Sequence, residues 1–170
     1  MNNVVRNAEK FAIAARRYCS TVDSTTNRKR AELLLEIYRI LPVLIGEAMA
    51  LPNVELRNNE GESEQPSHRV SHEAWATLYE SLKQKLDDWN AYKQVFDPTS
   101  LDTEPIFGSL ADDIADIYRD LQAGLQLGDK GQVCGDDAVF HWRLMFYSHW
   151  GKHAINALEV IHCRVSELLM

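Results

Sequence analysis

The sequence has few cysteines, prolines and glycines, and each shortage excludes a class of protein. The three cysteines are odd in number, lie far apart and include no C-x-x-C pair: Cys19, Cys134 and Cys163. This pattern argues against a disulfide framework or a structural zinc site, and it favours a reducing compartment. We therefore expect a cytoplasmic protein. Five prolines and eight glycines in 170 residues are also too few for a disordered or fibrous chain.

The chain also lacks a secretory signal, a membrane span and an excess of positive charge. Charged residues interrupt the N-terminal stretch at positions 4–10 (VVRNAEK), and no segment approaches the roughly 20 apolar residues of a span. The formal net charge of −7 would repel a phosphate backbone. We expect neither a nucleic-acid partner nor a membrane association.

Apolar residues with helical spacing fill most of the chain, and their content of 45% is enough for one core. They recur three and four positions apart over residues 2–20, 25–50, 71–96, 109–127 and 136–169. No alternating β-branched run is long enough to compete as a strand. We predict an all-α, single-domain bundle of about five helices. We expect it to pack around the long C-terminal helix, which is apolar on much of its circumference.

Two segments interrupt this periodicity. Residues 52–70 are rich in Asn, Glu, Ser, Gly and Pro, which predicts a flexible, solvated loop, and residues 97–108 form a second predicted loop. Ser71 and Ser109 stand where the caps of the following helices are expected, the latter with Asp112 three residues later. Pro42 falls opposite the apolar stripe of its helix, where it is tolerated.

The candidate site with the clearest spacing is His149 and His153. Two histidines four residues apart share one helix face, as two ligands of one metal ion require. They also fall on the stripe of Trp142 and Phe146, which favours the interpretation as core histidines bonded to backbone or carboxylate groups over that as ligands. An imidazole in such surroundings should have a lowered pKa unless a carboxylate lies beside it.

A metal site needs further ligands, and a divalent metal is the cofactor that these residues suggest. Glu36 and Glu47, at the inner margin of the second helix, are candidates, although a glutamate at a helix edge is commonly solvated. The segment from Asp112 to Asp120 supplies four more carboxylates. Asp112, Asp113 and Asp116 could bind a divalent ion and leave positions for phosphate oxygens. The alternative is a solvated face favoured by the helix dipole, since helical projection puts Asp112, Asp116 and Asp120 opposite the apolar stripe.

Residues 108–125 (GSLADDIADIYRDLQAGL) and 140–158 (FHWRLMFYSHWGKHAINAL) resemble a bacterial all-helical family catalogued as a domain of unknown function. Leu-Pro at 51–52 and Phe-Asp-Pro at 96–98 extend the likeness over most of the chain. The resemblance implies one helical domain and a bacterial cytoplasmic origin. It implies no activity.

Two functional hypotheses remain open. No Gly-x-Ser-x-Gly elbow or phosphate-binding glycine loop is present, and Cys163 and its neighbour His162 cannot face one another on a helix. The first hypothesis is a non-catalytic module that binds a protein partner or a small ligand, and that forms a homo-oligomer through aromatic helix faces. The alternative is a divalent-metal-dependent hydrolase acting on a phosphorylated substrate. The enzyme requires its acids and histidines to converge on one pocket.

Overall fold

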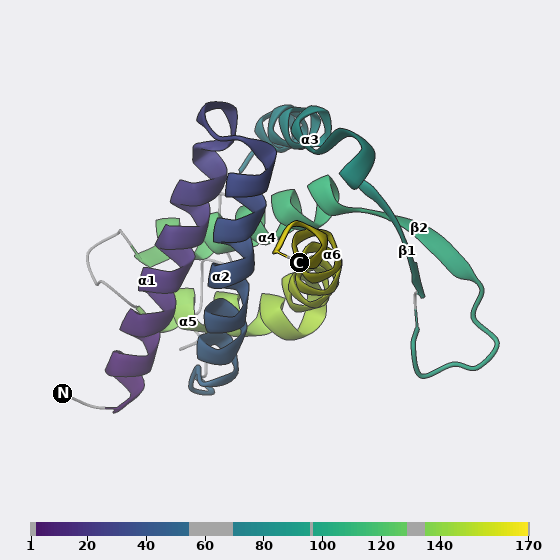
Figure 1. The fold of residues 1–170 in the computed structure, drawn as a ribbon. Coiled ribbons are helices and arrows are strands. Elements are labelled where there is room, and N and C mark those ends of the chain that lie inside the picture. Colours follow the sequence, from purple (N-terminus) through teal and green to yellow (C-terminus); the bar gives the residue numbers. More distant parts are fainter. Residues whose placement is uncertain (1–2, 55–69, 96, 129–134, 170) are drawn as a thin grey trace.

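The computed structural model describes residues 3–54, 70–95, 97–128 and 135–169, and it is predominantly helical, as the periodicity predicts (Figure 1). In chain order its main elements are α1 (Asn3–Asp23), α2 (Arg30–Met49), α3 (His72–Leu86), β1 (Ala91–Val95), β2 (Pro105–Ser109), α4 (Leu110–Gly128), α5 (Asp136–Met145), a π-helical turn (Phe146–Trp150) and α6 (Gly151–Leu169). None of the helices in these described ranges combines the length and hydropathy that a membrane span needs.

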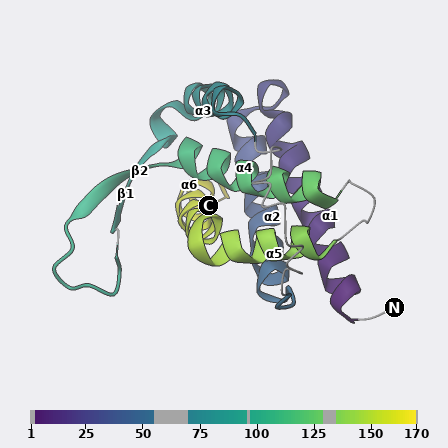
Figure 2. The same cartoon turned by 180° about the vertical axis from the view of Figure 1, so that it is seen from behind.

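Helix α4 occupies the middle of the bundle. It packs against α1, α3, α5 and α6, whereas the long C-terminal helix α6 packs mainly against α2 and α4. Helices α1 and α2 run side by side and form one layer, and α4 crosses behind them with α3 at one end (Figures 1 and 2). Because neighbours surround α4, side chains on nearly every face of this helix are covered.

Aromatic side chains fill the centre of the core. Phe11 of α1 contacts Trp142 and Trp150, with ring centroids 4.9 and 6.0 Å away. The Trp142 ring lies so close to Gly124 of α4 that a Cβ at position 124 would collide with it. The Trp142 indole N–H donates to the Leu121 carbonyl at 3.2 Å. The small residue on α4 therefore sets how near the C-terminal segment approaches.

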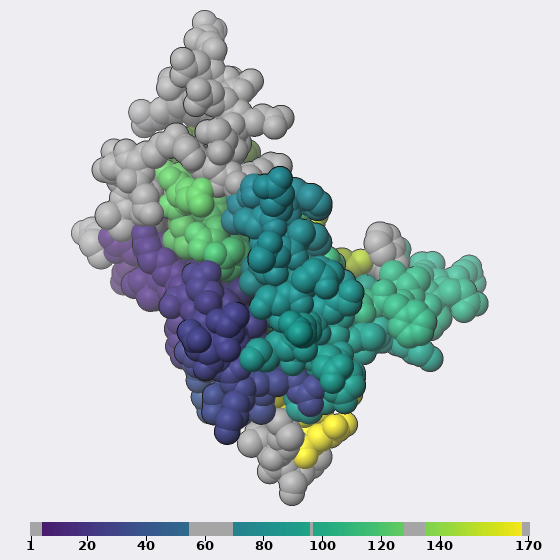
Figure 3. All heavy atoms as spheres, turned by 90° about the horizontal axis from the view of Figure 1, so that it is seen from above, coloured from purple at the N-terminus to yellow at the C-terminus, as the bar shows by residue number. Residues whose placement is uncertain are grey.

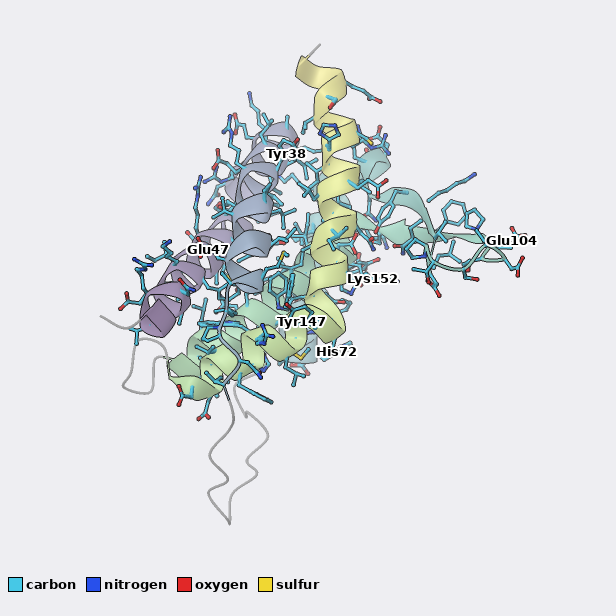
Figure 4. All side chains as sticks on the ribbon, turned by 90° about the horizontal axis from the view of Figure 1, so that it is seen from below. Tyr38, Glu47, His72, Glu104, Tyr147 and Lys152 are labelled. Atoms are coloured by element: carbon cyan, nitrogen blue, oxygen red, sulfur yellow. The ribbon has the colours of Figure 1, made fainter. Side chains whose placement is uncertain are left out.

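The last helical segment, predicted as one helix over 136–169, is continuous in hydrogen bonding but bends at the π turn (Figure 4). One extra residue per turn at 146–150 shifts the helical phase there, and sharp bends commonly occur at such turns and at glycines. Gly151 follows the turn, and a Cβ there would collide with the Phe146 carbonyl oxygen. The bend turns α6 away from the direction of α5.

The predictions that the third helix extends over residues 71–96 and that no strand is present were wrong. After α3 and a short 3-10 turn the chain forms β1, which pairs antiparallel with β2 in a register from Ala91↔Ser109 to Val95↔Pro105. Part of the predicted 97–108 loop is thus strand. Residues in β1 alternate between exposed and half-buried, a period of two that five residues are too short to reveal in the sequence.

Other local predictions have mixed outcomes. The Ser71 hydroxyl accepts from the Ala74 N–H at 3.1 Å and the Ser109 hydroxyl from the Asp112 N–H at 3.3 Å, so both caps are confirmed. Pro42 is exposed, as predicted. The predicted flexible loop at 52–70 lies largely outside the described residues.

The bend at the π turn generates a stability prediction. Replacing Gly151 by Ala should destabilise the fold by about 1–3 kcal/mol, because the added methyl meets backbone that cannot move freely. The matched control is Gly46→Ala in α2, where a Cβ meets nothing within 4 Å and helix propensity predicts a gain of up to about 1 kcal/mol. Urea unfolding of both variants measures the difference, and equal stabilities would contradict the account of the bend.

Candidate metal centre

Three aspartates of α4 face the π turn and the start of α6, and all three are buried. Asp113, Asp116 and Asp120 expose only 3%, 7% and 6% of their surface. Their spacing of three and four places them on one side of α4, and α6 packs along that helix. The expectation of a solvated acidic face is therefore wrong for these residues, because α4 is covered on that side too.

Each histidine is paired with one of these carboxylates through the same ring nitrogen. His149 Nδ1 lies 2.7 Å from Asp120 Oδ2, and His153 Nδ1 lies 2.7 Å from Asp113 Oδ1. A carboxylate in this position accepts the Nδ1–H proton, which leaves Nε2 as the nitrogen that can bind a metal. The two pairs fix the tautomer and the orientation of both rings.

The two free ring nitrogens converge on the third aspartate. Asp116 Oδ2 lies 3.8 Å from His149 Nε2 and 3.5 Å from His153 Nε2. The other oxygen, Oδ1, accepts from the Trp75 indole N–H at 2.9 Å and from the Arg119 guanidinium at 2.8 Å. Two donors thus hold Asp116 by one oxygen and leave Oδ2 facing the histidines.

These three side chains form a candidate metal centre: Asp116, His149 and His153. One ligand atom of each lies within 4.8 Å of the others. Ligands about 2.0–2.1 Å from a tetrahedral zinc ion are about 3.3 Å apart, so small rotations of the two rings would complete the geometry. Three protein ligands leave at least one coordination position open, as in catalytic rather than structural sites. The histidine side chains are 31% and 22% exposed, so water can reach that position.

Charge around the centre favours a cation between the rings. Burial lowers the pKa of His153, but its hydrogen bond to Asp113 and the charges of Asp113, Asp116 and Asp112 outweigh burial and raise the pKa above 6.5. From the sequence, a lowered histidine pKa is expected unless a carboxylate lies beside the ring, and here carboxylates do lie beside it. A site that attracts a second proton onto an imidazole also attracts a metal ion that replaces this proton.

Asp112 lies next to the candidate metal centre without forming part of the ligand triangle. Burial and the charge of Asp116, one helical turn away, raise the pKa of its carboxyl. It also interacts electrostatically with His153 and Arg119. No hydrogen bond to the Asp112 carboxylate is formed by the described side chains, which leaves it able to accept a proton.

A surface pocket of about 520 Å³ opens beside the centre, lined by Val70, His72, Arg119, Asp120, Ala123, Met145, Ser148 and His149. Two residues of this lining contact the Trp75 ring: His72 is stacked on it with ring centroids 5.8 Å apart, and the Arg119 guanidinium lies 5.6 Å from its centroid. Arg119 has more N–H groups than its bond to Asp116 uses. The pocket therefore offers hydrogen-bond donors to an anionic group.

The structure brings together His149, His153 and Asp116, and it places Asp113 as a partner of a histidine and Asp112 at the margin. Glu47 is not part of this group: it lies on α2, on the side of the bundle away from the hairpin, whereas Lys152, adjacent to His153, lies on the hairpin side (Figure 4). Glu36 bonds Arg17 and Arg39 instead, at 3.4 and 2.7 Å.

Sequence reasoning missed the residues that hold Asp116 and Asp113 in place. Trp75 and Arg119 fix Asp116, and the Tyr92 hydroxyl donates to Asp113 Oδ2 at 2.6 Å. Both Trp75 and Tyr92 fall within the helix predicted over residues 71–96, where apolar spacing assigns them to packing and indicates no role at a site.

The raised pKa of His153 predicts a pH dependence of the metal-free protein. Because the folded pKa exceeds 6.5, protonated His153 stabilises the fold fully below about pH 6.5, and this contribution is lost as pH rises through the folded value. The variant His153→Asn retains a donor for Asp113 but cannot be charged. As pH rises from about 6.5 through the folded pKa of His153, the melting temperature of this variant should therefore fall less than that of wild type. His162→Asn is the control, since His162 bonds the Tyr38 hydroxyl at 2.8 Å. Parallel pH profiles for wild type and His153→Asn would refute the charge assignment.

Comparison with known proteins places the chain in a family. The crystal structure of protein BF1032 from Bacteroides fragilis superposes with a TM-score of 0.78 over 95% of this chain and 94% of that chain. At 23% sequence identity this likeness shows a shared fold. No curated protein matches the sequence. The family described as a domain of unknown function, DUF5063, matches residues 2–166, and the chain belongs to this family.

Proposed function

We propose that the protein binds one divalent transition-metal ion at the candidate metal centre. The observation that carries the proposal is the shared orientation of the two rings. Each histidine bonds a buried aspartate through Nδ1, and both Nε2 atoms face the one oxygen of Asp116 that no described donor occupies. Two structural histidine–aspartate pairs would explain Asp113 and Asp120. They would not explain a third buried carboxylate that is held by Trp75 and Arg119 with one oxygen toward the rings.

The ligand set narrows the choice of ion. Two imidazoles and one carboxylate suit Zn²⁺, Fe²⁺, Mn²⁺ or Ni²⁺, whereas Mg²⁺ and Ca²⁺ prefer oxygen ligands throughout. The second shell is the carboxylate–histidine arrangement typical of zinc sites. Charge is balanced as well. A divalent ion between two neutral imidazoles leaves the same net charge as two imidazolium groups, so the ion replaces protons without leaving the three aspartates uncompensated.

Zinc should stabilise the folded protein by mass action, because the unfolded chain has no preformed site. At a free Zn²⁺ concentration 100 times the Kd, the gain is about 2.7 kcal/mol, measured as a rise in melting temperature after removal of metal by a chelator. The rise should be lost in Asp116→Asn and in His149→Ala, and it should shrink as pH falls and protons compete.

His162→Ala is the matched control for this experiment. His162 lies on the same helix as His153 but bonds Tyr38, so the variant should keep the full zinc-dependent rise. Wild type with no rise, or equal rises in Asp116→Asn and wild type, would reject the metal centre.

A second candidate function is hydrolysis of a phosphate ester, favoured by the position of Asp112 beside an ion with an open coordination site. A metal ion lowers the pKa of bound water, and a carboxylate of raised pKa nearby is suited to accept the proton. With such an ion bound, water deprotonated by Asp112 would attack phosphorus and the ester P–O bond would break. Protonated Asp112 would then return the proton to the leaving alkoxide. Arg119 and His72 in the adjoining pocket offer donors to the phosphate oxygens.

The hydrolytic function predicts a separation of activity from metal binding. With p-nitrophenyl phosphate as the probe, the Zn²⁺-loaded wild type should release nitrophenol, and Asp112→Asn should reduce kcat by about 100-fold while it keeps its zinc-dependent rise in melting temperature. Asp102→Asn, on the turn between the strands, is the control for a lost surface carboxylate. Metal-loaded wild type without activity, or equal kcat in both variants, would leave the protein as a non-catalytic binding module.

Location and partners are part of the same proposal. The free thiols of Cys19 and Cys163 support a reducing cytoplasm, and the likeness to a Bacteroides protein supports a bacterial origin. The hairpin exposes Leu101 and Phe107 at 100% and 80%, which supports contact with a protein partner or with a second copy of the chain.

A further inference from the structure

We propose that Tyr92 is a positioning residue of the metal centre and that the β1–β2 hairpin is therefore energetically coupled to the bound ion. This inference rests on the proposed metal-binding function and adds to it an element that projects from the bundle. In a space-filling view the hairpin extends well beyond the helices (Figure 3). The hairpin is linked to the site near its base, where side chains of β1 hydrogen-bond to Asp113 of α4 and Asn156 of α6.

Asp113 is the connection between the hairpin and the ion. Its Oδ1 pairs with His153 Nδ1 at 2.7 Å and its Oδ2 accepts from the Tyr92 hydroxyl at 2.6 Å. The carboxylate side chain is 4% exposed, so water is a poor substitute for either partner. Three residues from β1, α4 and α6 thus form one hydrogen-bond chain that ends at a metal ligand.

A second contact ties the same strand face to α6. Gln94, two residues beyond Tyr92 and on the same side of β1, accepts from the Asn156 amide at 2.7 Å. Asn156 follows His153 by three positions, which is one turn of α6. Tyr92 and Gln94 are the half-buried residues of β1, whereas its other three residues are exposed. The strand therefore meets the bundle through the two side chains that contact the neighbourhood of the metal centre.

The pairing of the strands shapes the position of the Tyr92 ring. Tyr92 is opposite Gly108, and a Cβ at position 108 would collide with the ring. The glycine lets the ring lie across β2 while the hydroxyl reaches α4. Asn90, just before β1, is bonded to the start of α4 in two ways. Its side-chain oxygen accepts from the Ala111 N–H at 2.8 Å, and its backbone carbonyl accepts from the Leu110 N–H at 2.9 Å. Tyr92 is thus two residues from a point fixed to the first turn of α4.

Coupling of this kind is reciprocal. If the docked hairpin raises metal affinity by some factor, the bound ion must stabilise the docked hairpin by the same factor. Partners that orient metal-bound histidines typically contribute 10- to 100-fold to metal affinity. Tyr92 is one hydrogen bond further from the histidine than such a partner, because it acts through Asp113. We therefore expect Tyr92→Phe to raise the Kd for Zn²⁺ by about 10-fold.

The test measures both directions of the coupling on the full chain. Zinc titration gives the Kd, and hydrogen–deuterium exchange of the amides in residues 91–95 and 105–109 gives hairpin stability with and without Zn²⁺. In wild type, saturating Zn²⁺ should slow this exchange, and in Tyr92→Phe the slowing should be reduced by about the same factor as the affinity. Tyr118→Phe is the matched control. Tyr118 lies on α4, and its hydroxyl donates to Asp23 of α1 at 2.7 Å. Because this bond does not involve the candidate metal centre, both measurements should equal those of wild type.

The outcomes separate the two proposals. If wild type binds Zn²⁺ but hairpin exchange is unaffected, and Tyr92→Phe binds as tightly as Tyr118→Phe, the coupling is refuted and the metal centre stands. If wild type binds no Zn²⁺, the metal centre and the coupling are both rejected. Should Tyr92→Phe fail to fold, Gln94→Ala removes the contact with Asn156 instead, and it should weaken zinc-dependent protection of the hairpin without removing a buried hydroxyl.

Discussion

Three buried carboxylates lie along one side of α4: Asp113, Asp116 and Asp120. Most of the surrounding structure supplies the hydrogen-bond donors and positive charges that compensate their burial. An unpaired buried carboxylate costs several kcal/mol, so each one needs a cation or several donors. Arg119 and the Trp75 indole satisfy one oxygen of Asp116, and His149 and His153 lie opposite Asp120 and Asp113. In the proposed metal centre, a divalent ion bound between the two rings and Asp116 Oδ2 would contribute to the same compensation.

The π turn and three glycines with close neighbours determine how the side chains of the site are placed. His149 belongs to the π turn and His153 to the first turn of α6, so the bend between α5 and α6 determines how both rings approach α4. Gly151 makes the bend sterically feasible, and Gly124 and Gly108 admit the rings of Trp142 and Tyr92. π turns are common at functional sites because they re-aim side chains without ending the helix. The core aromatics then hold the bent segment against α1 and α4.

The helices and the histidine pair were predictable from spacing, because both depend on local periodicity. The burial of the aspartates was not, since helical projection compares residues with the apolar stripe of their own helix and cannot show that α3, the hairpin and α6 cover the opposite side of α4. That Glu47 lies outside the group that the structure brings together could not be predicted for a similar reason: periodicity does not tell which helix faces the π turn. Tyr92 was missed because the five residues of its strand show no alternation of polarity, and its side chain continues the apolar spacing of the preceding helix.

The most direct test of the central claim is the position of a bound metal. We expect a crystal of the protein grown with Zn²⁺ to show an anomalous-scattering peak about 2.0–2.2 Å from Asp116 Oδ2 and from the Nε2 atoms of His149 and His153, with water completing the coordination. The Asp113 and Asp120 carboxylates should remain on the Nδ1 atoms. A peak elsewhere, or no peak at saturating Zn²⁺ with the two rings still facing Asp116, would contradict the account and leave the histidines as charge partners of a structural acidic cluster.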